Sequence, residues 1–544
     1  MSGTHAAQRH ADLLFYLPKT SEATTMYSNS GRSIRSIKIM MLVHLLIGIL
    51  SIMAVPAKAE PAESVDIVVV GAGASGISTA LAAAEAGAKV MVLEKMPFIG
   101  GTSNFAEGLF AAESDMQKRE CIRITRDEAF HIIMDYSHWR ANPDLVRAFV
   151  NKSGDTIAWL ENMGVKFIKP FAMWPNGPRT WHLLDGYGAA MMKVLYQQAQ
   201  AKGVEIATST TAKKIIRRPD GPITGVHVER ANAPAALIST KAVVIATGGY
   251  ANNKEWIKKY TGFDLGVNIF PIGNRGKMGE GIQMAWDVGA AEEGMGVLQW
   301  VEGGPGGPGI KMRSHINGAV PQPQFLWINL DGKRFADEGL AHNFTFHGNI
   351  HVRQKDGIVF RIFDESIKKY MIEKGIDHGM GVQIPVGTRL THLDEEIKAA
   401  MDAGNPNIFI AKNLDELAAK LGVNPKTFKQ TVAQYNSFCA KRHDDQYAKD
   451  PRYLMPIQTP NFYAFKCYPA FLGTIGGVKV NENLQALDKE GRIIPGLYVV
   501  GSDAGGMYGD SYDLFSAGGT LGFAVNSGRI AGKHAASFSS QRKN

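Results

Sequence analysis

The chain has 544 residues, of which 45% are hydrophobic and 20% are charged, a composition typical of a globular enzyme with two or three domains. Its net charge of +8 is unevenly spread, because residues 1–59 hold six Lys and Arg residues against two acidic ones. The rest is only mildly basic and has no block of Lys and Arg interleaved with aromatic residues, so we predict no nucleic-acid partner.

Residues 1–59 have the pattern of an export signal. The apolar run 39–55 follows Arg32, Arg35 and Lys38 and precedes an Ala-Lys-Ala sequence that ends at Ala59. This order predicts a secretory signal peptide cleaved after Ala59, and therefore a periplasmic or otherwise exported protein. The alternative is a membrane anchor over 39–55, because about 17 apolar residues approach the length that spans a bilayer.

A glycine motif marks a predicted dinucleotide-binding unit. Gly71-x-Gly73-x-x-Gly76 lies between a predicted buried strand and a predicted helix. The glycines allow a tight turn, a close approach of the backbone to a pyrophosphate, and packing of the helix against the strand. The second strand of the unit ends at Glu94, whose carboxylate can accept hydrogen bonds from a ribose.

Hydrophobic periodicity predicts the other elements in chain order. Helices are expected over 75–86, 123–164, 189–201, 394–403, 414–421, 425–439 and 517–536, and strands over 67–70, 89–93, 204–216, 225–229, 241–246, 325–330, 358–363 and 493–502. Gly- and Pro-rich turns near 303–309 mark a change in the sequence pattern, which we interpret as a domain boundary. We therefore predict an α/β fold, with a Rossmann-like domain formed by 60–297 and 472–544 and an inserted α+β capping domain over 298–471.

Several further motifs resemble flavoproteins of the fumarate reductase and succinate dehydrogenase superfamily, especially the soluble, exported fumarate reductases. The resemblance spans nearly all of 65–536, and the motifs that carry it, besides the first glycine motif, are Glu94-Lys95, Gly100–Ser103, Ala246–Gly249, Gly332–Phe335, Gly476–Val478, Gly501–Asp503 and Gly518–Thr520. It implies FAD as the cofactor. The FAD is expected to be non-covalent, because 101–112 lacks the histidine to which membrane-complex members attach it.

The resemblance also implies which residues contact FAD. Glu94 would hold the adenosine ribose, Gly101–Ser103 the pyrophosphate and flavin edge, and Asp503 the ribityl chain. The full predicted set is Gly71, Gly73, Ala74, Ser75, Gly76, Glu94, Lys95, Gly101, Thr102, Ser103, Ala106, Gly108, Ala212, Thr247, Gly248, Gly249, Gly473, Asp503, Thr520 and Leu521.

The sequence departs from fumarate reductases at the substrate-binding positions. His342 stands where those enzymes have a catalytic arginine after the Gly332–Phe335 turn, and Gly318 and Pro321 replace the residues of their proton relay. The segments 471–475 and 509–518 contain no histidine or arginine that could bind a dicarboxylate. We therefore expect a substrate other than fumarate, larger or more apolar.

Tyr512 is similar to a tyrosine of 3-ketosteroid dehydrogenases in the same superfamily, where a phenol polarises a carbonyl. A phenol O–H can stabilise the oxyanion that develops when hydride adds to a conjugated alkene. His342, Tyr508 or Tyr512 could supply the proton, and Arg179 and His182 are candidate substrate contacts. The tyrosines could instead be packed core rings.

Other readings of the charged and histidine residues stay open. His342, together with His347 and His351, could form an exposed polar loop. No metal site is predicted, because no cysteine or clear carboxylate partner accompanies these histidines. Arg334 is expected to be a structural charge.

The main hypothesis is an exported FAD-dependent reductase of an activated C=C bond in an unsaturated acid or enone. Cys121, Cys439 and Cys467 form no cluster or haem motif, so electrons would come from an external donor such as a c-type cytochrome or a membrane quinol dehydrogenase. One alternative is a 3-ketosteroid-type dehydrogenase that introduces a double bond next to a carbonyl. Another is a non-catalytic flavin electron carrier.

Overall fold

The computed structural model describes residues 63–173, 177–230, 233–301, 303–311, 313–379 and 384–542. All of these residues belong to one structural unit. The predicted leader, 1–59, and its alternative as an anchor over 39–55 lie outside the described residues.

A mostly parallel sheet forms the centre of the larger part of the fold. Its strand order is β19-β20-β9-β1-β2-β6, with β8 and β7 added through β9. Residues 67–69 of β1 are completely buried, as expected for a strand of a parallel sheet that is covered on both faces. The strands are β1 (Ser64–Val70), β2 (Val90–Leu93), β6 (Glu205–Ala207), β7 (Thr210–Arg217), β8 (Ile223–Arg230), β9 (Ala233–Ile245), β19 (Gln485–Leu487) and β20 (Ile493–Val499).

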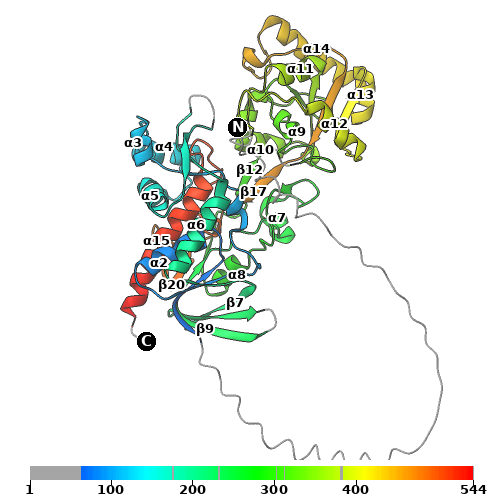
Figure 1. Ribbon diagram of the computed structural model, residues 1–544. Helices are drawn as coiled ribbons and strands as arrows, with labels where there is room; N and C mark the ends of the chain where they lie inside the picture. The colour runs from blue at the N-terminus through cyan, green and yellow to red at the C-terminus, as the bar shows by residue number, and fades with distance from the viewer. Residues whose placement is uncertain are drawn as a thin grey trace, which may run out of the picture. The chain divides into compact units, whose positions relative to one another are not determined.

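Two helices that are far apart in the sequence pack closely against this sheet. Figure 1 shows α2 (Ala74–Glu85) and α15 (Gly519–Gln541) side by side. A Cβ atom at Gly528 would lie 2.4 Å from the carbonyl oxygen of Ser75, and one at Gly532 would lie 2.4 Å from that of Thr79. Glycines on α15 therefore allow the two backbones to meet. The predicted Rossmann-like α/β class is confirmed.

Smaller elements complete this part of the molecule. They are η2 (Gly101–Phe105), β3 (Gly108–Phe110), α3 (Asp115–Arg119), α4 (Arg126–Tyr136), α5 (Pro143–Asn162), β4 (Phe167–Phe171), β5 (Trp181–Leu184), α6 (Tyr187–Ala201), α7 (Lys254–Thr261), β10 (Phe270–Pro271), α8 (Glu280–Asp287), β11 (Glu292–Glu293), β12 (Leu298–Val301), β17 (Ala470–Thr474), β18 (Gly477–Val478) and η6 (Gly501–Asp503). The helix predicted over 123–164 is in fact two helices, α4 and α5. The break occurs because Asn142 caps α5 and Pro143 occupies its first position.

A second hydrophobic core lies within the predicted insertion. Its buried residues run from Ile316 to Cys467, around an antiparallel sheet of order β13-β14-β16-β15. Leu298, Trp300 and Phe471, near the predicted boundaries, belong to the first core instead. We call the residues around the second core the cap; Figure 1 shows its helices α11 to α14 together.

The cap contains the following elements. They are α9 (His315–Ala319), β13 (Leu326–Asn329), η3 (Glu338–His342), α10 (Phe344–His351), η4 (Lys355–Gly357), β14 (Val359–Asp364), α11 (Glu365–Glu373), α12 (Leu393–Asp402), β15 (Ile408–Ala411), α13 (Leu414–Leu421), α14 (Pro425–Lys441), η5 (Pro451–Tyr453) and β16 (Phe462–Cys467). Arg334 precedes η3 and is buried with Glu338 and Asp444, both within 2.8 Å of its guanidinium. It is thus placed as a structural charge.

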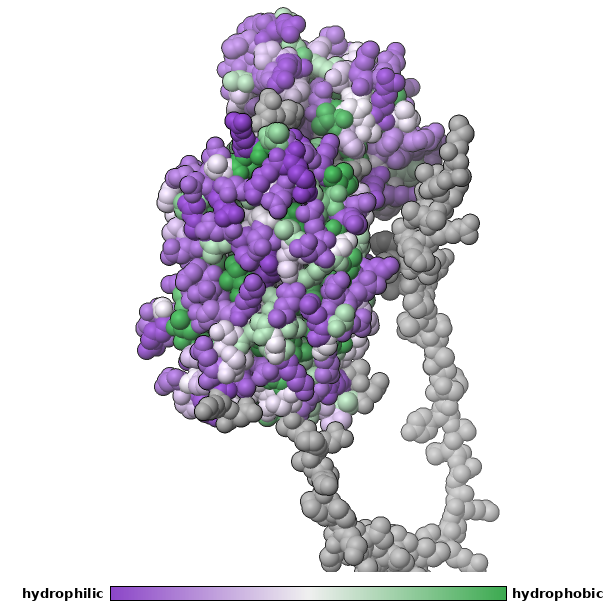
Figure 2. Space-filling view, turned by 60° about the vertical axis from the view of Figure 1, so that its left-hand side comes forward, coloured by the Kyte–Doolittle hydropathy of each residue, from purple (hydrophilic) through white to green (hydrophobic). Residues whose placement is uncertain are grey.

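On the face shown in Figure 2, hydrophobic side chains form small separate patches between hydrophilic ones. None of the helices in the described residues is both long enough and apolar enough to cross a membrane.

Candidate active site

The turn between β1 and α2 has the geometry of a phosphate cradle. A Cβ atom at Gly76 would lie 1.8 Å from the carbonyl oxygen of Gly71, so glycine is required there by packing. At Gly73 the nearest atom to such a Cβ is Ser103 Oγ, 3.8 Å away. Protein packing therefore does not require glycine at 73, whereas close approach of a ligand would. Ser103 Oγ also accepts a hydrogen bond from Ala74 N at 3.1 Å, which joins η2 to the helix N-terminus.

Glu94 is held ready at the end of β2. Its carboxylate accepts hydrogen bonds from the backbone N–H groups of Ala72, at 2.9 Å, and Met96, at 2.8 Å. The two oxygens keep further lone pairs, so they can also accept from ribose hydroxyls. Thr210 N donates to the carbonyl oxygen of Glu94, which brings the start of β7, with Ala212, beside this position.

Lys95 is occupied by protein partners. Its ammonium group donates to Glu280 Oε1 at 2.7 Å and to the carbonyl oxygen of Gly276. This pair ties the end of β2 to α8, so Lys95 supports the cradle through α8.

Asp503 joins the ends of β9 and β20. The buried carboxylate accepts hydrogen bonds from Thr247 Oγ1 at 3.0 Å, Gly248 N at 2.9 Å and Gly249 N at 2.7 Å. Burial raises the pKa of Asp503, and the hydrogen bonds from the three donors oppose that rise. The predicted residues 247–249 and 503 thus form one hydrogen-bonded group.

The start of α15 lies against β3. Gly518, with a φ of 85°, is the N-cap of α15, and its carbonyl oxygen accepts from Phe110 N at 2.9 Å. Thr520 and Leu521 lie in the first turn of the helix, where N–H groups favour negative charge. Gly108 lies in the same strand β3 as Phe110, and the predicted Ala106 precedes that strand.

Tyr512 lies at the same end of α15. Its hydroxyl has hydrogen-bonding partners in Thr520 and Gln299, and Gln299 Nε2 donates to Thr520 Oγ1 at 3.1 Å. Burial raises the pKa of Tyr512 to about 12, against the opposing effect of those hydrogen bonds. The phenol is therefore a neutral hydrogen-bond donor near pH 7. Gln299, close to the predicted Gly473, was not identified from the sequence.

Tyr508 packs 5.6 Å from Tyr512, measured between ring centroids. Its buried hydroxyl has no hydrogen-bond partner within the described part of the chain, and it lies 3.4 Å from where a Cβ of Gly519 would be. Buried polar groups usually have partners, so this hydroxyl is free to bind a ligand at the α15 N-terminus. Burial raises the pKa of the neighbouring Asp513 to about 6.

The cap reaches this site through polar contacts and aromatic rings. Thr345 Oγ1 donates to the carbonyl oxygen of Tyr512 at 2.7 Å, and the Tyr136 hydroxyl donates to Asn343 Oδ1 at 3.2 Å. The Tyr136 ring stacks on Phe346 at 5.5 Å and lies 5.5 Å from Phe515. Phe346 and Phe515 are 43% and 36% exposed. We call Tyr136, Phe346 and Phe515 the aromatic cluster.

His347 and His351 are buried and His342 is partly buried, so the exposed-loop interpretation is wrong. His347 and His351 are each 1% exposed because α10 turns them toward the cap interior. His342, at the end of η3, shares a hydrogen bond with His378, 3.0 Å between their Nδ1 atoms. Burial lowers the pKa of both, that of His378 to about 3, so the pair is neutral near pH 7. His378 was not identified from the sequence.

His182 has both ring nitrogens engaged by the protein. Its Nε2 lies 2.6 Å from Ser114 Oγ, and its Nδ1 lies 3.0 Å from the carbonyl oxygen of Thr180. Burial lowers its pKa to about 4. These contacts favour a structural role in β5 over a contact with substrate.

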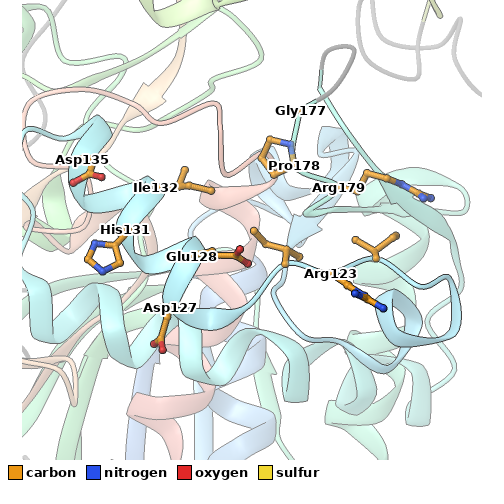
Figure 3. A pocket seen from close by; sticks show the side chains of 11 residues that line it. Arg123, Asp127, Glu128, His131, Ile132, Asp135, Gly177, Pro178 and Arg179 are labelled. Carbon is orange, nitrogen blue, oxygen red and sulfur yellow. The ribbon is translucent and has the colours of Figure 1, made fainter.

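Arg179 lies in a surface groove that does not include Tyr508, Tyr512 or the His342 and His378 pair. Its guanidinium binds Glu120 and the carbonyl oxygen of Pro170. Figure 3 shows the groove, which is lined by the labelled side chains Asp127, Glu128, His131, Ile132 and Asp135 of α4 and, from neighbouring segments, Arg123, Gly177, Pro178 and Arg179. Acidic and basic groups are mixed there, and the tyrosines and Glu94 are not among its lining residues.

The buried neutral histidines predict acid lability. The folded-state pKa values of His182, His351 and His378 are about 4, 3 and 3, below an unfolded value of about 6.5. Their contribution to stability is complete above pH 6.5 and is lost as the pH falls toward those values. At pH 5 each of these three histidines should lower the free energy of unfolding by about 2 kcal/mol relative to pH 7.

Urea denaturation at pH 7 and pH 5 measures this loss. H351L removes one such group and should lose less stability between the two pH values, whereas H443Q, on the surface, should lose as much as the unmodified protein. Equal urea midpoints for the unmodified protein at the two pH values would contradict the assignment.

Comparisons with known proteins agree with an FAD-binding flavoprotein fold. The profile of the FAD binding domain family matches residues 66–518. A vinyl phenol reductase of Lactiplantibacillus plantarum is 38% identical over 485 residues, which cover 88% of this chain and 98% of that protein. A fumarate reductase (cytochrome) of Shewanella frigidimarina is 28% identical over 88% of this chain and 78% of that protein. The solved structure of 3-ketosteroid delta1-dehydrogenase from Sterolibacterium denitrificans shares the fold, with a TM-score of 0.70 and 20% identity over 87% of this chain and 100% of that one.

Proposed function

The chain belongs to the FAD binding domain family, within the fumarate reductase and succinate dehydrogenase flavoprotein superfamily, and from this premise we propose that it reduces an activated C=C bond. The observation that carries the proposal is the neutral phenol of Tyr512, which lies with Gln299 at the N-terminus of α15. Bound, reduced FAD supplies a hydride for such a reaction. The open space at Gly73 and the donors of the β1–α2 turn fit its pyrophosphate, and Glu94 fits its ribose.

Tyr512 acts as the electrophilic group. When hydride adds to an alkene conjugated with a carbonyl, negative charge develops on the carbonyl oxygen, and a positioned O–H donor stabilises it. Gln299 and Thr520, which are hydrogen-bonded to each other, are the polar side chains that interact with the Tyr512 hydroxyl. The neutral hydroxyl of Tyr508 is a second donor at the same helix N-terminus.

The proton comes from the histidine pair of the cap. In the Nδ1 to Nδ1 hydrogen bond one ring of His342 and His378 is the donor, so the other carries its proton on Nε2. The two Nε2 atoms are buried and have no protein partner in the described residues. When that Nε2 gives up its proton, the shared hydrogen bond passes a proton across from the partner ring, and the partner ring takes up a proton from water at its own Nε2.

The aromatic cluster supports a substrate with an aromatic ring. Tyr136, Phe346 and Phe515 offer partly exposed ring surface next to Tyr512 and Asn343, and such surfaces bind rings by offset stacking. The 38% identical relative is a vinyl phenol reductase. We propose an alkene conjugated with a phenol or with a carbonyl-bearing aryl group.

Reduction of a phenolic alkene and reduction of an enone both generate negative charge on an oxygen atom. Loss of the phenol proton and addition of a proton from the histidine pair to the terminal vinyl carbon give a quinone methide, whose benzylic carbon accepts hydride while the oxygen becomes a phenolate. In both cases negative charge ends on an oxygen, where Tyr512 can donate. The buried Asp513, whose pKa is raised to about 6, could accept the phenol proton.

Electrons come from outside the chain. The three cysteines of the described residues form no disulfide, with Cys121 at the surface and Cys439 and Cys467 buried, and none provides a second redox centre. A c-type cytochrome or a membrane quinol dehydrogenase suits an exported enzyme. The basic and apolar order of residues 1–59 supports export.

Anaerobic oxidation of reduced methyl viologen tests the proposal directly. The purified protein is expected to turn over 4-vinylphenol or an aryl enoate or enone, and to leave fumarate unreduced because segments 471–475 and 509–518 contain no histidine or arginine to bind a second carboxylate. Fumarate turnover would contradict the substrate assignment. Absence of turnover by the FAD-loaded protein, with double-bond formation beside a ketone when an electron acceptor is supplied, would favour the dehydrogenase alternative instead.

A further inference from the structure

A lysine that the family motifs do not include lies inside the cofactor cradle. Lys277 Nζ donates to Thr102 Oγ1 at 2.9 Å, and a Cβ atom at Gly248 would lie 3.4 Å from the same Nζ. Thr102 is adjacent to Ser103, whose hydroxyl accepts from the first N–H of α2. The ammonium group therefore lies between η2 and the turn after β9.

The backbone of Lys277 is held in place by a reciprocal pair of hydrogen bonds. Lys277 N donates to Asn252 Oδ1 at 3.0 Å, and Asn252 N donates to the carbonyl oxygen of Lys277 at 2.9 Å. The direction of the side chain is thus fixed from its base.

The charge of Lys277 is not neutralised by the protein. Among the described residues no carboxylate lies within 4.0 Å of Lys277 Nζ. Asp503 is the nearby acid, but its oxygens are taken by Thr247, Gly248 and Gly249. Burial lowers the pKa of Lys277 to about 8, and Asp503 opposes this only in part. An ammonium group taken out of water without a counter-ion is costly unless a bound anion completes the site.

We infer that Lys277 binds the pyrophosphate of FAD. The helix N-terminus at α2 already directs N–H groups to that pyrophosphate, and Lys277 adds a point charge from the opposite wall of the cradle. A lysine ammonium suits a phosphate oxygen because it is compact and offers three donors. The inference concerns the cofactor and is independent of the substrate.

Binding constants for FAD and ADP measured on the full chain test this assignment. K277M should weaken FAD binding by about 10- to 100-fold, the usual effect of losing a charge-assisted hydrogen bond. ADP carries the pyrophosphate without the flavin, so its affinity as a competitor of FAD should fall by the same factor. K277R should recover most of the loss, and K258M, which breaks an exposed pair with Asp264, should change neither constant.

Three results would overturn the inference. One is an unchanged FAD affinity in K277M at an unchanged melting temperature. Another is a loss of FAD affinity with ADP affinity intact and a more negative flavin midpoint potential, which would place Lys277 against the flavin ring. An equal loss of FAD and ADP affinity in K277M that K277R does not restore would likewise indicate a structural role for Lys277.

Discussion

Replacement of Tyr512 by phenylalanine is expected to lower kcat/KM by about 10²- to 10³-fold, the usual effect of removing one oxyanion donor. The ring keeps its packing against Tyr508, so FAD content and melting temperature should stay close to those of the unmodified protein. The measurement is anaerobic turnover of the best substrate from the methyl viologen assay, with kcat and KM separated.

A matched control distinguishes loss of chemistry from loss of structure. Y196F removes a hydroxyl of α6 that accepts only from Gln200 at the surface, and it should retain full activity. If Y512F loses less than threefold in kcat/KM, the electrophilic role belongs to another group, with Tyr508 next to be tested.

Replacement of Arg334 by methionine should destabilise the cap by about 3–5 kcal/mol, because it leaves buried carboxylates without their counter-ion. Glu338 and Asp444 have completely buried side chains and lie 2.7 and 2.8 Å from the guanidinium. Lys449, 3.2 Å from Glu338, cannot compensate both acids. Urea denaturation followed by the fluorescence of Trp327, a buried residue of the cap, measures the change.

The surface pair of Arg452 and Asp450 provides the comparison. Its arginine side chain is 76% exposed, so R452M should leave the urea midpoint nearly unchanged. A similar small loss in R334M would show that the buried network relaxes or admits water when the arginine is removed. Because η3 carries both Glu338 and His342, R334M should also lower turnover.

The parts of the fold that depend on local chemistry could be predicted from the sequence. The spacing of one strand, one turn and one helix predicts the positions of Gly71, Gly76 and Glu94. In the structure these three residues lie together around the turn between β1 and α2. The break between α4 and α5 also has a local signal, the N-cap Asn142 followed by Pro143. It was missed because the apolar periodicity on both sides resembles that of one continuous helix.

The residues missed by sequence reasoning are those that only the fold brings together. Gln299 reaches Thr520 across 221 residues of sequence, and Lys277 reaches Thr102 across 175. A single glutamine in a strand or lysine in a loop carries no local signal of such a partner. His378 was hidden for the same reason, since its partner His342 lies on a different segment of the cap.

Two hydrogen bonds that join the cap to the rest of the molecule end at the proposed site itself. Thr345 binds the backbone of Tyr512, and Tyr136 binds Asn343, next to His342. The cap is therefore not an exchangeable module. A chimaera that takes its cap from a relative would form these two bonds only if that cap brings a hydroxyl at position 345 and a side-chain acceptor at position 343.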